Sequence, residues 1–413
     1  MFDRRRFCGV AAAASLPFPA RAASADLPFY ASVGPDLSWY GFDEANGELV
    51  RKGGVRLPAN VQYAWPDMAG FGFLYVAASN NRPDADAAAN RHCLQAFHVG
   101  GEGALTPVGA PVPLRQRPVH ITVDAGNRYL VAAYNIPAAV SVHHIRPDGA
   151  IGAEIPQPAL DTGIYAHQVR FTPSGRSLVL VTRGNDARPG RPEDPGALKV
   201  FSFRDGMLSN LQSLAPKGSG IGFGPRHVDF GKRHCFVSLE RENSIGVYGL
   251  EPDGRLGGEP LFIRNALLDT DAKAKLPGQT AGPIHVHPNG RFVYQTNRGS
   301  GTVDFKGRKV WNGGENNIVV WAVNPATGEP TRIQNADSHG FELRTFSITP
   351  DGRWLIAAAQ VGLDVREGDA TRFVSAGFAI YHIGTDGRLT FVRKLDVDTS
   401  AGPLFWSGLL TMP

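Results

Sequence analysis

The chain has 413 residues, with 42 Lys and Arg against 38 Asp and Glu, and a formal net charge of +4. Its 49 glycines and 31 prolines suit many short strands joined by turns, and weak helical periodicity argues against a helical enzyme fold. Beyond residue 22, no run of Lys and Arg suggests nucleic-acid binding, and no apolar segment approaches the length of a membrane span.

The first 22 residues have the features of an export signal. The twin-arginine phrase Asp3-Arg4-Arg5-Arg6-Phe7 precedes an apolar run at residues 8–18, which is too short to span a bilayer. Ala20-Arg21-Ala22 then resembles a cleavage site, with Ala23-Ser24-Ala25 as a second choice. We therefore expect a Tat-type signal peptide over residues 1–22 and a periplasmic mature protein. The alternative is a disordered tail.

Removal of such a signal also removes most of the net charge. Four arginines and Asp3 would leave, so 38 basic and 37 acidic residues remain and the formal charge falls from +4 to +1. The basic pI is therefore mainly a property of the signal, and we expect no nucleic-acid partner and no membrane insertion of the mature chain.

A short turn phrase recurs along the whole chain, each time after an apolar strand. Its glycine supplies the positive φ of a tight hairpin, and Asp or Asn tolerates the neighbouring position. The seven copies are Asn46-Gly47-Glu48-Leu49, Gly101-Glu102-Gly103-Ala104-Leu105, Pro147-Asp148-Gly149-Ala150-Ile151, Arg204-Asp205-Gly206-Met207-Leu208, Pro252-Asp253-Gly254-Arg255-Leu256, Pro325-Ala326-Thr327-Gly328-Glu329 and Thr385-Asp386-Gly387-Arg388-Leu389. A period this long with one hairpin per copy indicates a repeat architecture.

A second turn phrase alternates with the first and precedes another apolar strand. It occurs as Asp124-Ala125-Gly126-Asn127-Arg128, Thr172-Pro173-Ser174-Gly175-Arg176, His287-Pro288-Asn289-Gly290-Arg291 and Thr349-Pro350-Asp351-Gly352-Arg353. Each repeat then has two hairpins and four strands, A to D, with the second phrase between A and B and the first between C and D. Seven such units predict an all-β fold, a seven-bladed β-propeller, as a single domain over residues 26–413.

The two ends of this domain complement each other. The first repeat begins at a B-like strand, residues 27–32, with no A strand before it, and a lone strand at residues 403–410 follows the last repeat. We expect the C-terminal strand to complete the N-terminal blade and close the ring, which removes exposed sheet edges.

Two cysteines remain after loss of Cys8 with the signal. Cys93 falls in a C-like strand of the second repeat and Cys235 in a B-like strand of the fifth, so their blades are not neighbours. We expect two buried free thiols, although an oxidising compartment would also permit a disulfide.

Polar residues gather where the A strands begin and the B strands end, two places that share one face of a blade. Because A strands line the central channel, these side chains are expected to converge on one axial pocket. The A-strand candidates are His120, His167, Arg226, His227, His285 and Arg344, and the B-strand candidates are Glu240, Asn297 and Arg298. Each histidine could instead bond a neighbouring blade, and each of Arg226 and Arg298 could pair structurally with Glu240.

Four inward histidines also raise the question of a metal. A hard cation would need several carboxylates, and only Glu240 stands at an equivalent position. A zinc ion would need its ligands within about 2.1 Å, which is too short for a seven-bladed channel. We therefore expect no metal at this site.

Four connections are longer than the repeat requires, namely residues 187–196, 262–280, 300–316 and 362–373. The first, third and fourth join B to C and the second joins D to A, so all are expected on the pocket face, where specificity is usually built. Trp311 and Asn312 on the third could cover a ligand.

These phrases resemble the lactonase propellers, which group propeller-type bacterial 6-phosphogluconolactonases with fungal carboxymuconate lactonising enzymes. The resemblance spans the mature chain. It lies in Gly224-Pro225-Arg226-His227-Val228, Leu239-Glu240-Arg241-Glu242-Asn243-Ser244-Ile245, His287-Pro288-Asn289-Gly290-Arg291-Phe292-Val293-Tyr294 with Asn297-Arg298-Gly299, Pro350-Asp351-Gly352-Arg353 with residues 355–360, and Ala401-Gly402-Pro403-Leu404-Phe405-Trp406.

The resemblance implies a catalytic pocket of His167, Arg226, Glu240 and Arg298, no cofactor, and an anionic lactone or sugar acid as substrate. The remaining candidates, His120, His227, His285, Arg344 and Asn297, are then expected to bind substrate. We expect a monomer, although the sequence itself does not fix the oligomeric state.

Three functions fit these expectations. In a lactonase, Arg226 and Arg298 would hold an anionic group and stabilise the oxyanion, while Glu240 or His167 takes a proton from the attacking water. In a muconate-type cycloisomerase, the same arginines would clamp carboxylates and His167 would move the proton. A propeller that binds a ligand or partner without turnover is the third interpretation.

Overall fold

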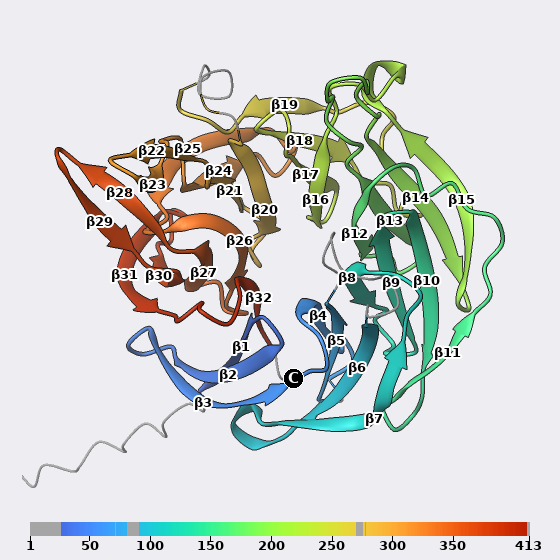
Figure 1. The fold of residues 1–413 in the computed structure, drawn as a ribbon. Coiled ribbons are helices and arrows are strands. Elements are labelled where there is room, and N and C mark those ends of the chain that lie inside the picture. Colours follow the sequence, from blue (N-terminus) through green and yellow to red (C-terminus); the bar gives the residue numbers. More distant parts are fainter. Residues whose placement is uncertain (1–25, 71, 81–90, 270–275, 277, 411–413) are drawn as a thin grey trace, which may run out of the picture.

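The computed structural model describes residues 26–70, 72–80, 91–269, 276 and 278–410, and the predicted signal peptide lies outside these ranges. Seven four-stranded antiparallel sheets form a ring, with one strand of each sheet facing the centre (Figure 1). The predicted seven-bladed β-propeller is therefore confirmed. We keep the letters A to D for the strands of each blade, from the axis outward.

Each set of strands is given in the order of blades 1 to 7. The A strands are β32 (Leu404–Leu409), β4 (Val61–Pro66), β8 (Pro118–Val123), β12 (Ala166–Phe171), β16 (Pro225–Phe230), β20 (Thr280–Val286) and β26 (Phe341–Ile348). The B strands are β1 (Leu27–Val33), β5 (Phe73–Ser79), β9 (Tyr129–Asn135), β13 (Ser177–Thr182), β17 (His234–Leu239), β21 (Phe292–Arg298) and β27 (Trp354–Val361).

The outer half of each blade consists of a C and a D strand. The C strands are β2 (Asp36–Asp43), β6 (His92–Val99), β10 (Ala138–Ile145), β14 (Ala197–Arg204), β18 (Ser244–Gly249), β24 (Asn317–Val323) and β30 (Gly377–Ile383). The D strands are β3 (Glu48–Arg56), β7 (Leu105–Pro113), β11 (Ile151–Ile155), β15 (Met207–Leu214), β19 (Phe262–Asn265), β25 (Pro330–Asp337) and β31 (Leu389–Asp396).

The ring closes through the two ends of the described chain, as predicted. Strand β32 pairs antiparallel with β1, with Tyr30 opposite Gly408 and Ser32 opposite Trp406. The backbone N–H of Trp406 also donates a hydrogen bond of 3.2 Å to the Ser32 hydroxyl. Blade 1 thus joins residues from both ends of the sequence, and β1 is paired on both of its edges, with β2 and with β32.

The recurring turn glycines hold neighbouring blades together. In every blade the glycine of the C–D turn has a positive φ, between +64° at Gly47 and +88° at Gly254. Each also lies against the start of the B strand in the preceding blade, and the seven contacts are Gly47–Trp354, Gly103–Pro28, Gly149–Phe73, Gly206–Tyr129, Gly254–Ser177, Gly328–His234 and Gly387–Phe292. Both the backbone angle and the close approach therefore require glycine.

The core is distributed over the seven interfaces between blades. Each of seven clusters of buried apolar side chains combines residues from two adjacent blades. Between blades 6 and 7, for example, the buried Tyr294 packs in one cluster with Phe346 and Tyr381 and donates a hydrogen bond of 2.8 Å to the carbonyl of Gly387. Blade faces therefore supply the apolar burial that stabilises the fold.

Two of the long connections form strands of their own, which differs from the irregular loops expected there. Residues 300–316 contain β22 (Thr302–Phe305) and β23 (Arg308–Trp311), and residues 362–373 contribute to β28 (Leu363–Glu367) and β29 (Ala370–Val374). These four strands form an eighth sheet through a parallel pair of Val310 with Asp364, and we call it the added sheet (Figure 1).

The connection expected at residues 262–280 is also shorter than the sequence suggested, because its first residues form β19, the D strand of blade 5. On either side of the C–D turn, Leu250 and Leu256 form only an isolated β-bridge. The D strand therefore begins at Phe262, six residues after Leu256, where the turn phrase ends. The turn therefore located the hairpin correctly but not the start of its second strand.

Cys93 on β6, the C strand of blade 2, and Cys235 on β17, the B strand of blade 5, are buried and free, as predicted. Helical structure in the described ranges is limited to two 3-10 turns, η2 (Gly101–Gly103) and η3 (Pro216–Gly218). Over those ranges, no helix has the length and apolar character to cross a membrane.

The turn contacts give a testable stability prediction. A Cβ at Gly387 would clash with the Phe292 ring, whereas nothing lies within 4 Å of a Cβ at Gly290, and both residues have a positive φ. Gly290→Ala should cost only the backbone strain, about 1 kcal/mol, and Gly387→Ala should cost about 1–3 kcal/mol more. Urea unfolding measures the free energy of unfolding of both variants. Equal losses in Gly290→Ala and Gly387→Ala would contradict the prediction that the close approach to Phe292 requires glycine.

Candidate active site

The A strands share a β-bulge near their start. One register shift against the B strand occurs in each blade, and it leaves one extra residue in the A strand. The residues at the bulge in blades 1 to 7 are Phe405, Gln62, Val119, His167, Arg226, Gly282 with Pro283, and Arg344. A bulge redirects a side chain out of the normal alternation, so it can present a residue at the axis.

The four predicted histidines do not share one register. His167 is itself the bulged residue of blade 4, whereas His120 and His227 each form the first pair after the bulge. His285 is the second paired residue after the two-residue shift of blade 6, opposite Tyr294. The four histidines were expected at a similar level of the channel, one at the start of each A strand. His285 does not lie at that level, because it is one residue further from the bulge of its strand than His120 and His227 are from theirs.

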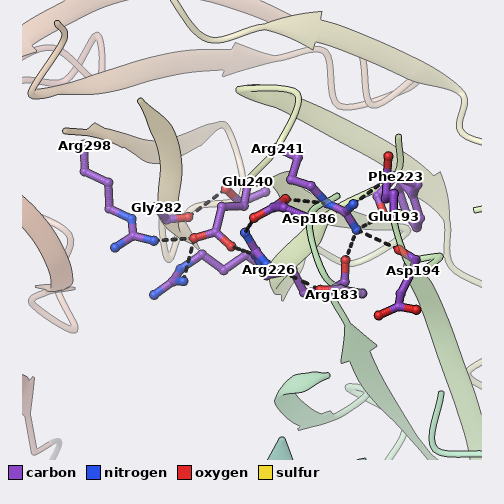
Figure 2. A network of polar contacts seen from close by, with 12 residues as sticks. Arg183, Asp186, Glu193, Asp194, Phe223, Arg226, Glu240, Arg241, Gly282 and Arg298 are labelled. Atoms are coloured by element: carbon purple, nitrogen blue, oxygen red, sulfur yellow. Dashed lines mark hydrogen bonds and ion pairs between the residues drawn. The ribbon is translucent and has the colours of Figure 1, made fainter. Parts of the chain in front are cut away.

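Glu240 lies at the centre of a buried ionic network. It follows β17 and is 4% exposed. Arg226 donates from Nη1 to Glu240 Oε1 at 2.9 Å, Arg298 donates to the same oxygen, and Arg183 donates from Nε to the other oxygen (Figure 2). Three residues that the sequence predicted together, Arg226, Glu240 and Arg298, are thus in direct contact.

The network fixes the charge states of its members. Burial alone would raise the pKa of the Glu240 carboxyl, but Arg226, Arg298 and Arg183 outweigh burial and lower this pKa to about 2. Burial and the nearby Arg298 lower the pKa of Arg226 to about 10. At neutral pH both groups are charged, so Glu240 acts as a counter-ion and is a poor proton acceptor.

Glu342 is a member of this network that the sequence analysis missed. It precedes Leu343 on β26, has a φ of +56°, and accepts a hydrogen bond from Arg298. The Asn316 side chain holds this segment, because its Oδ1 accepts the backbone N–H groups of Glu342 and Gly299, each at 3.1 Å. The only sequence signal was its place just before the A-strand arginine of blade 7.

Arg344 adds a positive charge that the described part of the chain does not balance. Its guanidinium lies over the Phe405 ring at 4.0 Å, and it forms no ion pair with a carboxylate of the described residues. Burial, Arg226 and Arg298 hold its pKa well below the usual value. Burial is the main cause of this lowering and the neighbouring arginines add to it, so a bound anion would offset the part that comes from charge.

Three imidazoles lie beside the arginines. The ring centres of His167 and His227 are 5.2 Å apart, and those of His227 and His120 are 6.4 Å apart. The pKa of each of these three histidines lies well below its usual value, mainly because the rings are buried. The positive charge of Arg226 lowers the pKa values of His167 and His227 further. The rings are therefore neutral at neutral pH, and the buried Nδ1 of His167 has no hydrogen-bond partner among the described residues.

Two further candidates lie outside the Glu240 network. His285 approaches Asp229 at 3.4 Å, and Asp229 also pairs with Arg170 at 3.0 Å. Asn297 is fully buried, and its amide nitrogen donates to the Ala266 carbonyl at 2.9 Å and to Asn317 at 3.0 Å. Both side chains are thus held by the protein itself, and their role in substrate binding stays a prediction.

The described residues contain no group of three or more His, Cys, Asp or Glu side chains arranged for a metal ion. Within the site itself, the oxygens of Glu240 are taken up by guanidinium groups. The arrangement is therefore suited to an anion and not to a cation.

Arg241 fixes the connection that follows Arg183. Its guanidinium pairs with Glu193 and donates to the backbone carbonyls of Arg183 and, at 3.3 Å, of Phe223 (Figure 2). One buried side chain thereby ties the insertion at residues 187–196 to the strand end that carries Arg183. The insertion is part of the structure that positions the Glu240 network.

Comparison with protein families agrees with this geometry. The family model described as "Lactonase, 7-bladed beta-propeller" matches residues 30–366. The chain belongs to this family. Its predicted resemblance to the lactonase propellers is confirmed, and the match covers blades 2 to 6 and parts of blades 1 and 7.

Similar members of the lactonase family are distant in sequence. A 6-phosphogluconolactonase of Bacillus subtilis is 27% identical over 255 residues, which cover 58% of this chain and 62% of the relative. One of Erwinia tasmaniensis is 24% identical over 329 residues, covering 78% and 86%. The structure of a periplasmic gluconolactonase of Pseudomonas aeruginosa is 20% identical with a TM-score of 0.67, covering 94% and 99%, and shares the fold.

The depressed pKa of Glu240 predicts how stability depends on pH. Its pKa is about 2 in the folded protein against an ordinary value of 4.5, so its stabilising effect is complete above about pH 5.5 and is lost as pH falls toward 2. Glu240→Gln should therefore lower the free energy of unfolding by about 3 kcal/mol at pH 7 and by much less at pH 3.

Urea unfolding from pH 7 to pH 3 tests this prediction. Glu329→Gln is the matched control, because it removes a half-exposed partner of Arg264, and it should change the unfolding free energy by less than about 0.5 kcal/mol. A loss for Glu240→Gln that stays constant across this range would contradict the predicted charge state.

Proposed function

We propose that this chain is a lactonase that hydrolyses a lactone carrying an anionic group, a phosphate or a carboxylate. The observation that carries the proposal is the charge of the site. Arg183, Arg226, Arg298 and Arg344 lie around two buried carboxylates, those of Glu240 and Glu342, and the exposed carboxylate of Asp186 pairs with Arg183 alone. The names of the distant relatives, 6-phosphogluconolactonase, support the same substrate class.

In the proposed reaction, Glu240 keeps the guanidinium groups in place and Arg344 contacts the anionic group of the substrate. Arg226 and Arg298 then stabilise the negative charge that develops on the carbonyl oxygen when water attacks. Because Glu240 has a pKa of about 2, it is not the base. Of the two groups that the sequence left open for this role, we therefore assign the proton transfer to His167.

The substrate itself would prepare His167 for this task. The positive charges of Arg226, Arg344 and Arg298 lower the pKa of His167 in addition to burial. An anion bound to these arginines would offset that effect and raise the pKa toward neutrality, where a general base is most efficient. His167 would take the proton from water and return it to the ring oxygen that leaves.

Turnover of a charged and an uncharged lactone tests this assignment. We expect Arg344→Ala to lower kcat/KM for 6-phosphogluconolactone by about 10²-fold or more and for gluconolactone by less than about tenfold, because only the former loses an ionic contact. Arg366→Ala is the matched control, since Arg366 also lies over an aromatic ring, that of Phe305 at 4.5 Å, but on the added sheet.

His167→Gln should lower kcat by about 10²–10⁴-fold with little change in KM. No turnover of either lactone above spontaneous hydrolysis would reject the proposal, and so would equal losses for both lactones in Arg344→Ala. A muconate diacid, tested beside the lactones, would report cycloisomerase activity.

We also propose that the mature protein is periplasmic. The twin-arginine phrase at residues 3–7 supports this location. Replacement of Arg4 and Arg5 by lysine should retain the unprocessed chain in the cytoplasm, whereas Arg21→Lys should not. Immunoblots of cell fractions measure both, and export that is unchanged by the double replacement would contradict a Tat-type signal.

A further inference from the structure

A cavity lies beside the added sheet, next to the segment that carries Glu342, since Asn316 and Phe341 belong to its lining. Its volume is about 580 Å³, which is typical of small-molecule sites. The lining comes from Trp311 on β23, Val365 on β28, Phe391 on β31 and the connection between β25 and β26, which includes His339. No residue of the Glu240 network lines it, so its ligand need not be the lactone.

Aromatic rings provide much of the wall of this cavity. The Trp311 ring lies 5.1 Å from that of Phe341, and the imidazole of His339 lies against Phe391 at a tilt of 30°, with 3.7 Å between ring centres. Phe391 nonetheless remains 41% exposed.

The backbone holds the His339 ring in this position at some cost. His339 has a φ of +54°, a conformation that few non-glycine residues adopt, and its N–H donates to Asp337 Oδ1 at 2.9 Å. Such strain often marks a functional site, because the surrounding structure must maintain it.

The charges around the cavity cancel, unlike those around Glu240. Glu315 and Asp337 contribute two negative charges, and Arg372 and Lys394 contribute two positive charges. Arg372 is also paired with Glu367 at 2.6 Å, and Lys394 donates to the Ser375 carbonyl at 2.7 Å. A charged ligand would gain no net attraction here, and the polar lining disfavours a purely apolar one.

We propose that this cavity binds the ring of a neutral sugar. A pyranose has apolar C–H faces that pack on aromatic rings such as those of His339, Phe391 and Trp311, and hydroxyl groups that bond polar side chains at its edge. Asn316, Asp337 and Ser338 are polar residues of the lining. The proposal is independent of the lactonase function.

Saturation-transfer NMR on the purified protein tests the proposal. The probes are methyl glycosides of glucose, galactose and mannose, together with maltose and cellobiose. We expect transfer from the protein to the sugar ring protons for at least one probe, with a Kd on the order of 1 mM. His339→Asn, in which asparagine tolerates the positive φ, and Phe391→Thr should each weaken binding by about tenfold or more.

Phe373→Thr is the matched control, because Phe373 is 64% exposed on β29 and does not line this cavity. It should bind the probes as the unchanged protein does, and thermal unfolding confirms that the three variants are folded. Absence of transfer for every probe would overturn the proposal, and so would binding that survives both His339→Asn and Phe391→Thr. Lactone turnover is measured in parallel, so failure here is distinguishable from failure of the lactonase assignment.

Discussion

A close contact between a turn glycine and the start of a B strand joins each blade to the one before it. The contact recurs seven times, from Gly47 against Trp354 to Gly387 against Phe292, and so it sets the spacing of the whole ring. Because the A and B strands of a blade form one hairpin, this spacing also fixes where the inner strands begin. The distances among Arg226, Glu240 and Arg298, which come from two adjacent blades, therefore depend on turns at the outer rim.

Charge, and not shape alone, defines what the centre of the ring can bind. Glu240 satisfies three guanidinium groups and Glu342 shares one of them, but Arg344 rests on an aromatic ring without a carboxylate partner in the described chain. Taking guanidinium groups out of water is costly, and a bound anion would offset part of that cost. The neutral imidazoles of His167 and His227 belong to the same balance, since the arginines disfavour their protonation.

The sequence predicted what short-range rules determine. Turn glycines gave seven blades and ring closure, and the shared face of strands A and B brought Arg226, Glu240 and Arg298 together. It missed the added sheet, because β23 and β28 come from different blades and pair at a single position. It also missed Glu342, which has no counterpart in the repeat, and the register of His285, because a bulge shifts side chains without leaving a mark in the apolar pattern.

The ring of bulges has an evolutionary consequence. A bulged residue stands outside the regular alternation of its strand, so its side chain need not belong to an interblade core. Val119 still packs against the core between blades 3 and 4, and a Cβ at Gly282 would meet Thr296, but His167 and Arg226 belong to none of the apolar clusters. Substitutions at bulges of the latter kind can exchange the chemistry of the channel mouth while the scaffold persists, which makes the fold adaptable to new ligands.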